Sequence, residues 1–212
     1  RLHYLYPEWI DDRLIDVIAR EDKILKYLDI PLQHCNDKIL KKMNRRGDKK
    51  YLCALLDKLR ERIPGLVLRT SIIAGLPGEG EEEFDELCDF LREQKLLRAG
   101  VFPYSPEEGT RAAKMERVDS DEAARRAERI VDIQSEIIDA WNDERQGDVM
   151  EVLCEGFDGQ SMLFVGRSYA ESPDIDGRIY FSAPRDVAAG EFVPVRITGA
   201  MDGELTGELA EE

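Results

Sequence analysis

The sequence predicts an α/β region built on parallel strands, followed by a small all-β region. Two short apolar runs, Tyr27–Pro31 and Leu66–Ala74, end abruptly in polar or Gly/Pro-rich turns, and a helical pattern follows each of them. After Gly147 the pattern changes, and brief apolar runs alternate with clusters of Gly, Pro and Asp. Alternating strands and helices favour a parallel sheet, whereas closely spaced strands favour a barrel or a sandwich.

The α/β region contains strands and helices in alternation. Strands are expected at residues 2–6, 27–31, 66–74 and 99–104, and helices at residues 11–20, 37–43, 49–62 and 81–93. Four parallel strands with no partner beyond the first would leave an unpaired sheet edge, which proteins normally cover. We therefore interpret residues 1–145 as the C-terminal portion of a larger, TIM-like α/β barrel.

A long helix at about residues 119–145 is expected to link the two regions. Asp119 or Ser120 can cap its first turn, and Gly147 is well placed to end it. Apolar residues recur every three or four positions along it, at Ala123, Ala127, Ile130, Ile133, Ile137 and Trp141. The expected domains are therefore residues 1–145 and residues 146–212.

Residues 146–212 predict a small five-stranded barrel or sandwich. Its strands are expected at residues 148–154, 162–169, 178–182, 192–199 and 204–208. This region carries 14 Asp and Glu against 4 Arg and no Lys, a net charge of −10 within a chain total of −15. Such a charge disfavours nucleic acid as a partner and favours a basic protein. General solubility or a salt-adapted source is the alternative explanation for the acidity.

The composition indicates the cellular compartment and argues against a cysteine metal site or a disulfide framework. No apolar run approaches the ~20 residues that a membrane span needs, and no signal peptide is visible. The four cysteines lie far apart, with no spacing typical of a metal site or a disulfide framework. We therefore expect reduced thiols in a cytoplasmic protein, with no membrane partner.

Polar and conformationally special residues follow two of the expected strands. Gln33 and His34 come after one strand, and the next is followed by Gly75, Pro77, Gly78 and Glu79. Because chemistry in parallel sheets lies just past the carboxyl ends of the strands, these positions predict a catalytic rim. Two alternatives stay open: His34 as a hydrogen-bonded structural group, and the Gly/Pro segment as an ordinary tight turn.

Six segments resemble the radical S-adenosylmethionine (SAM) methylthiotransferases of the RimO type. They are RLHYLYP at 1–7, YLDIPLQH at 27–34, MNRRG at 43–47, LRTSIIAGLPGE at 68–79, VFPYSPEEGT at 101–110 and GRSYAESPDIDGRIYF at 166–181. The resemblance implies the second half of a radical-SAM barrel followed by an OB-like TRAM domain. It also implies an enzyme with two [4Fe-4S] clusters that adds a methylthio group to the β-carbon of an aspartate in small-subunit ribosomal protein twelve.

The resemblance also implies where SAM binds. Its expected neighbours are inward-facing residues at the barrel mouth, namely Tyr4, Tyr6, Gln33, His34, Ser71, Ile73, Gly75, Phe102 and Tyr104. The family holds its radical-SAM cluster with a C-x-x-x-C-x-x-C loop, which this chain lacks. We therefore expect no cluster and no metal site in this chain, and no activity from it alone. No catalytic residue is assigned.

The acidic TRAM region is expected to bind the basic ribosomal protein. Asp174 and Asp176, in the SPDIDG loop, are the candidate substrate contacts, although Asp and Gly there also suit an ordinary turn. Two other functions stay open. One is a tRNA-modifying methylthiotransferase, and the other is a non-catalytic TRAM-containing binding module.

Overall fold

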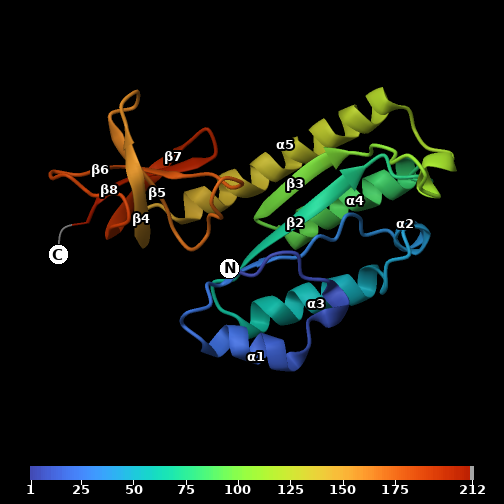
Figure 1. Ribbon diagram of the computed structural model, residues 1–212, viewed down its shortest axis with the longest axis horizontal. Helices are drawn as coiled ribbons and strands as arrows, with labels where there is room; N and C mark the ends of the chain where they lie inside the picture. Colours follow the sequence, from blue (N-terminus) through green and yellow to red (C-terminus); the bar gives the residue numbers. More distant parts are fainter. Residues whose placement is uncertain (211–212) are drawn as a thin grey trace. The chain divides into compact units, whose positions relative to one another are not determined.

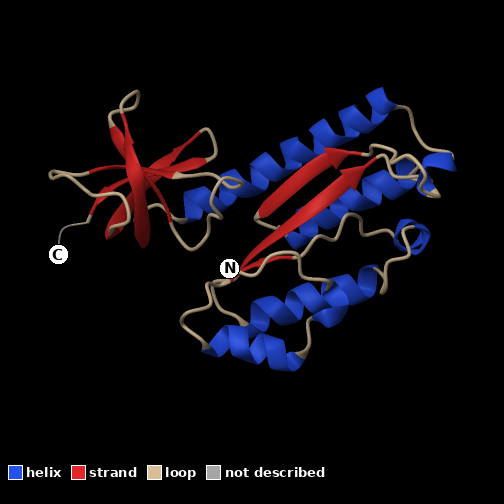
Figure 2. Ribbon diagram, in the orientation of Figure 1, coloured by secondary structure: helices blue, strands red, loops and turns tan. Residues whose placement is uncertain are grey.

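The computed structural model describes residues 1–210. The chain divides into two compact units, Arg1–Ile137 and Ile138–Glu212, whose helices and strands are labelled in Figure 1 and coloured by type in Figure 2. The first unit is α/β and the second is all-β apart from the end of one helix, as the sequence predicts.

The first unit is built on a parallel sheet with strand order β1-β2-β3. The strands are β1 (Tyr27–Asp29), β2 (Val67–Ala74) and β3 (Arg98–Pro103). The arrows of β2 and β3 run side by side in Figure 2. Paired residues share a face of the sheet, and the register pairs Asp29 with Arg69 and Ile73 with Phe102.

The strand expected at residues 2–6 is wrong. The segment pairs with the sheet only through an isolated bridge, Leu2 to Leu28. The Asp29 N–H donates to the Leu2 carbonyl and the Leu5 N–H donates to the Asp29 carbonyl, both at 2.9 Å, but no continuous ladder forms. Tyr4, between Leu2 and Leu5, has φ 59°, a left-handed conformation that breaks the extended run a strand requires. The short helix η1 (Pro7–Trp9) follows, so the sheet has three strands among the described residues rather than four.

The predicted helices are confirmed with small shifts at their ends. They are α1 (Asp12–Arg20), α2 (Asp37–Lys42), α3 (Lys49–Arg62), α4 (Glu81–Gln94) and α5 (Ser120–Glu144), with a short η2 (Ala112–Lys114) before α5. Side-chain caps fix several starts: the Asp11 and Asp48 carboxylates accept backbone N–H bonds in the first turns of α1 and α3. Local capping chemistry therefore sets where these helices begin.

The two faces of β2 have different surroundings. Leu68, Ile72 and Ala74 are buried in the main core, together with side chains from α1, α3, α4 and α5. The alternate residues Ser71 and Ile73 are only half-buried. Helices therefore cover one face of the sheet, and the other face is partly open.

The second unit is a closed five-stranded barrel, which confirms the predicted all-β region. Its strands are β4 (Val149–Asp158), β5 (Leu163–Arg167), β6 (Ile179–Ser182), β7 (Phe192–Met201) and β8 (Glu204–Leu209). They close in the order β4-β5-β6-β8-β7, and all neighbouring pairs are antiparallel except β6 and β8. Inward residues such as Val152, Phe181 and Val195 form the barrel core, and Trp141 from the last turns of α5 packs on it.

No helix in the described part of the chain is long and apolar enough to cross a membrane.

Candidate functional site

Backbone hydrogen bonds join the predicted rim segments after β1, β2 and β3. The Gln33 N–H donates to the Ser71 carbonyl at 2.8 Å, and the Ile73 N–H donates to the Gln33 carbonyl at 3.0 Å. On the other side of β2, the Tyr104 N–H donates to the Ala74 carbonyl at 2.8 Å. Gln33 adopts φ 68°, so its position in the rim depends on an unusual backbone conformation.

The nine residues expected near SAM differ in exposure. Tyr4, Tyr6 and Phe102 are exposed, by 78%, 54% and 53%. Four are half-buried, namely Gln33, Ser71, Ile73 and Tyr104. The remaining two, His34 and Gly75, are buried. Sheet pairing and backbone bonds bring Gln33, Ser71, Ile73, Phe102 and Tyr104 together, whereas Tyr4 lies beside Asp29 and the Tyr6 ring lies under the Arg45 guanidinium.

The Tyr104 hydroxyl and the Gly75 N–H differ in whether the chain itself satisfies their hydrogen bonding. The Tyr104 hydroxyl is buried and has no hydrogen-bond partner among the described residues. Such an orphaned group is costly unless a ligand or water satisfies it. The Gly75 N–H, in contrast, already donates to the Glu79 carboxylate at 2.9 Å, so this donor is used within the chain.

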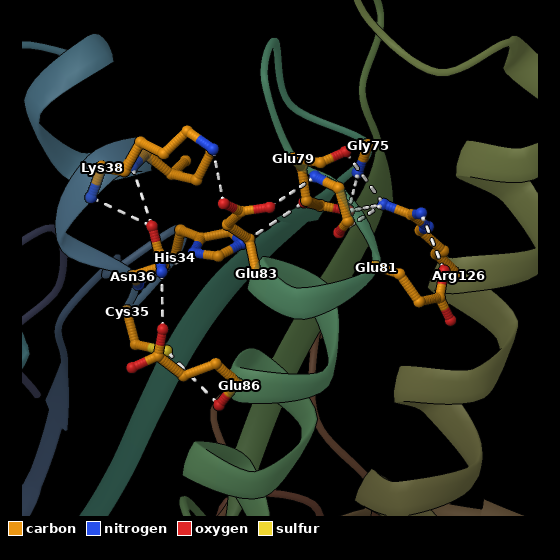
Figure 3. Close-up of polar contacts among 12 residues, drawn as sticks. His34, Cys35, Asn36, Lys38, Gly75, Glu79, Glu81, Glu83, Glu86 and Arg126 are labelled. Carbon is orange, nitrogen blue, oxygen red and sulfur yellow. Dashed lines mark hydrogen bonds and ion pairs between the residues drawn. The ribbon is translucent and has the colours of Figure 1, made fainter.

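His34 is fully buried behind the rim. Its Nδ1 accepts the Asn36 N–H at 3.0 Å, so a neutral ring must carry its proton on Nε2. That nitrogen lies 3.3 Å from Glu79 Oε2, within electrostatic reach although the atoms are not aligned as an ordinary hydrogen bond. Figure 3 shows the imidazole between Asn36 and Glu79. The structural alternative for His34 therefore has specific support, and a direct contact with SAM stays a prediction.

Glu79 is a buried carboxylate at the centre of the site, only 3% exposed. Its Oε1 accepts from the Gly75 N–H at 2.9 Å and from Arg126 Nη1 at 2.8 Å. Burial alone would raise the pKa of Glu79, but the neighbouring His34, Arg126 and Gly75 N–H outweigh it, and the pKa lies below its ordinary value. Glu79 is therefore held as a charged group inside the protein.

Arg126 reaches Glu79 from α5 and was missed by sequence reasoning. Its side chain is 6% exposed, and its guanidinium lies over the Phe84 ring at 5.0 Å. It also donates to Glu122 Oε1 at 2.9 Å. A further bond runs to Glu81 Oε2 at 3.2 Å (Figure 3). The available signal was weak: an arginine directly beside the apolar position Ala127 of the predicted helix.

The cysteines do not fit a metal cluster. No group of three His, Cys, Asp or Glu residues within residues 1–210 is placed to hold a metal ion. Burial raises the pKa of the thiols of Cys35, Cys53, Cys88 and Cys154, which favours the protonated form over the thiolate that binds iron.

The two candidate substrate contacts in the barrel unit have different surroundings. Asp176 is half-buried, and its carboxylate accepts the Ser172 N–H at 2.8 Å, which closes the SPDIDG turn. Asp174 is exposed and adopts φ 67°. Of the two, Asp174 is the one that presents its side chain to solvent.

The comparisons with known proteins agree with this architecture. Residues 2–91 match the family model described as the Radical SAM superfamily, and residues 147–210 match the model described as the TRAM domain. The chain is 44% identical to the ribosomal protein uS12 methylthiotransferase RimO of Acetivibrio thermocellus, covering 100% of this chain and 47% of that protein. The corresponding proteins of Symbiobacterium thermophilum and Pelotomaculum thermopropionicum are 46% and 47% identical, over 100% and 98% of this chain and 44% and 47% of theirs. The chain belongs to the RimO family.

The RimO relatives named above are about twice as long as this chain, which spans about half of their length. Among solved structures, coproporphyrinogen III oxidase (HemN) from Escherichia coli, a radical SAM enzyme, matches with a TM-score of 0.52 at 20% identity. The match covers 64% of this chain and 32% of that one, and it supports the fold alone.

Proposed function

We propose that the chain is the C-terminal half of a radical SAM methylthiotransferase that modifies ribosomal protein uS12. The reaction would place a methylthio group on the β-carbon of an aspartate of that protein. The observation that carries the proposal is the match of the whole chain to RimO proteins at 44–47% identity, across both its α/β unit and its barrel.

The strand-end rim suits SAM. The ring of Phe102 is exposed at this rim, where it can contact an adenine or a methionyl chain. The rings of Tyr4 and Tyr6 are also exposed, on the segment before α1, and their contact with SAM stays a proposal. The orphaned Tyr104 hydroxyl provides a buried polar group at the same rim. When bound, SAM would supply the radical and the methyl group of the reaction, and these residues would bind and orient it.

The [4Fe-4S] clusters of such an enzyme would be held by residues other than those of this chain. The described cysteines are scattered and their thiols favour protonation, so they do not fit as cluster ligands. We therefore assign no step of the reaction to them.

The acidic barrel supports a basic protein substrate. Residues 146–212 carry a net charge of −10, and a basic ribosomal protein would be drawn to that surface. A tRNA substrate fits less well, because phosphates are bound mainly by Lys and Arg, and this region has 4 Arg and no Lys. Modification of a ribosomal protein would place the enzyme in the cytoplasm.

The test is an assay of the full-length protein that we propose contains this chain. After anaerobic reconstitution with iron and sulfide, it is incubated with SAM, a reductant and either uS12 or tRNA, and products are analysed by mass spectrometry. We expect one methylthio group on an aspartate of uS12 and none on tRNA. Modification of tRNA would favour the tRNA-modifying alternative, and SAM-independent binding of uS12 without any reaction would favour a binding module.

The rim is tested in the same assay with Tyr104→Phe, which removes only the orphaned hydroxyl. We expect a raised KM for SAM with a melting temperature at or above the wild-type value, because an unsatisfied buried hydroxyl does not stabilise the fold. Tyr51→Phe is the matched control, since the Tyr51 hydroxyl bonds to the Pro7 carbonyl at 2.9 Å. An unchanged KM in Tyr104→Phe would remove this hydroxyl from the SAM site.

A further inference from the structure

One buried carboxylate joins three segments of the first unit that lie far apart in the sequence. The Glu79 carboxylate accepts hydrogen bonds from the Gly75 N–H of its own loop and from Arg126 Nη1 of α5 (Figure 3). The His34 imidazole, from the segment after β1, lies 3.3 Å from the same carboxylate. All three side chains involved are at least nine-tenths buried. The contact with Arg126 spans 47 positions of sequence.

The loop between Gly75 and Gly80 takes its shape from these contacts. Gly75 and Gly78 adopt φ of 83° and 84°, and the Glu79 N–H closes a turn onto the Leu76 carbonyl at 2.9 Å. Arg126 Nη1 bonds to the carboxylate and also to the Glu79 and Gly80 carbonyls, at 3.2 and 3.3 Å. The guanidinium therefore holds both the side chain and the backbone of the loop.

His34 extends the same contacts to the other rim segment. Its Nδ1 accepts the Asn36 N–H, and the Asn36 side chain caps α2 through the N–H groups of Lys38 and Ile39. Its neighbour Gln33 adopts φ 68° and exchanges two backbone bonds with β2. The orientation of the imidazole and the backbone position of Gln33 are therefore coupled.

We infer that Glu79 and Arg126 are positioning residues, which fix the backbone of the Gly75–Gly80 loop and the orientation of His34 and thereby hold Gln33 and Gly75 in place for SAM. The inference rests on the proposed function. Neither side chain needs to touch the ligand, because both are buried behind the rim. A small displacement of the rim backbone is enough to weaken binding strongly, since affinity for an oriented ligand falls steeply with misplacement.

The first experiment examines the contacts in the 212-residue chain, without activity. The chain has 2 histidines, so ¹⁵N-histidine labelling resolves His34 from His3. We expect a neutral ring with the proton on Nε2 in the wild type, and a protected Gly75 amide in hydrogen exchange. In Glu79→Gln we expect the Nε2 proton resonance to move and exchange at Gly75 to accelerate by about tenfold or more. A His34 ring protonated on Nδ1, or Gly75 exchange unchanged in Glu79→Gln, would overturn the inference.

The second experiment measures SAM binding by calorimetry in the full-length protein. We expect Glu79→Gln and the milder Arg126→Lys to weaken SAM affinity by about tenfold or more and to raise KM more than they lower kcat. Asp85→Asn is the matched control, because Asp85 lies on α4, the helix that follows the Glu79 loop, and pairs with Arg129 of α5 at 3.5 Å on the surface. The control should bind SAM like the wild type.

The outcomes separate this inference from the proposed function. Wild-type protein that binds no SAM, with the His34 and Gly75 signatures present, would refute the proposed function while leaving the contacts intact. Wild-type protein that binds SAM, with folded Glu79→Gln and Arg126→Lys variants that bind it equally well, would refute the positioning role alone. An equal loss of SAM affinity in Asp85→Asn would show that the effect comes from general packing of α4 on α5, and this would also refute the positioning role.

Discussion

The buried Asp29 and the half-buried Arg69 form an ion pair on the less covered face of the sheet, with Asp29 Oδ1 3.1 Å from Arg69 Nη1. The two residues are directly paired between β1 and β2, and Asp29 is 1% exposed. The other carboxylate oxygen accepts the Tyr4 N–H at 3.3 Å. The pair thus connects the sheet to the segment that replaces the expected first strand.

Replacing only Arg69 should lower the free energy of unfolding more than replacing both Asp29 and Arg69. We expect Arg69→Met to lower the free energy of unfolding by about 3–5 kcal/mol, because it leaves the Asp29 carboxylate buried without its cation. The double variant Asp29→Asn/Arg69→Met should lose less than Arg69→Met alone. Urea denaturation of the four proteins gives the coupling energy, and simple additivity of the two single variants would contradict the ion pair's importance.

Gly75 and Gly109 allow backbone strain to be separated from steric contact, since both adopt φ 83°. A Cβ at Gly75 would lie 2.6 Å from the Ala123 Cβ, whereas a Cβ at Gly109 would meet nothing within 4 Å. We expect Gly109→Ala to destabilise by about 1–2 kcal/mol from strain alone. Gly75→Ala should cost about 1–3 kcal/mol more. Equal losses in thermal unfolding would show that α5 does not pack closely on this strand end.

Glu79 should make stability depend on pH in the acid range. Because its pKa in the folded protein lies below the ordinary value of 4.5, the unfolded chain binds the proton more tightly. The stabilisation is therefore complete above about pH 4.5 and is lost as the pH falls through the lowered pKa. Glu79→Gln should be less stable at neutral pH, and its stability should fall less between about pH 5 and pH 3. Glu82→Gln, an exposed change on α4, should keep the wild-type slope in urea unfolding at each pH.

Reconstitution of the 212-residue chain with iron and sulfide should yield no [4Fe-4S] cluster. Among the described residues, no three His, Cys, Asp or Glu side chains are placed to hold a metal ion, and burial raises the pKa of all four thiols. Iron and sulfide analysis with visible absorbance measures the outcome. Stoichiometric iron with a broad visible band that disappears in Cys35→Ser would contradict this prediction.

Asp174 should contribute to the rate of association with a basic ribosomal protein. We expect Asp174→Asn to slow association with uS12 by about twofold at low salt, with little change in dissociation, because an exposed charge mainly steers encounter. Asp202→Asn is the matched control, since Asp202 is also exposed and has a positive φ of 53°. Stopped-flow or surface-binding kinetics at several salt concentrations measure both. An association rate that changes neither with salt nor with either substitution would show that electrostatic attraction does not contribute to recognition of uS12.

Local sequence patterns predict much of the fold. The apolar spacing from Ala123 to Trp141 predicts α5, and the buried or half-buried state of those positions agrees. The Gly/Pro/Asp breaks after Gly147 predict the strands of the barrel. The strand at residues 2–6 failed because its apolar alternation could not reveal the left-handed backbone at Tyr4, which depends on contacts with Asp29.

The sequence by itself determined the order of helices and strands from residue 11 onward, the acidity of the barrel and the strand-end positions of Gln33, His34 and Gly75, because capping, periodicity and composition act over a few residues. Only the tertiary structure decided that Glu79 is charged and buried, that His34 lies behind the rim, and that Arg126 joins them. These features depend on α5 packing against loops more than 40 positions earlier in the chain, and no local pattern records which distant charge will compensate a buried one.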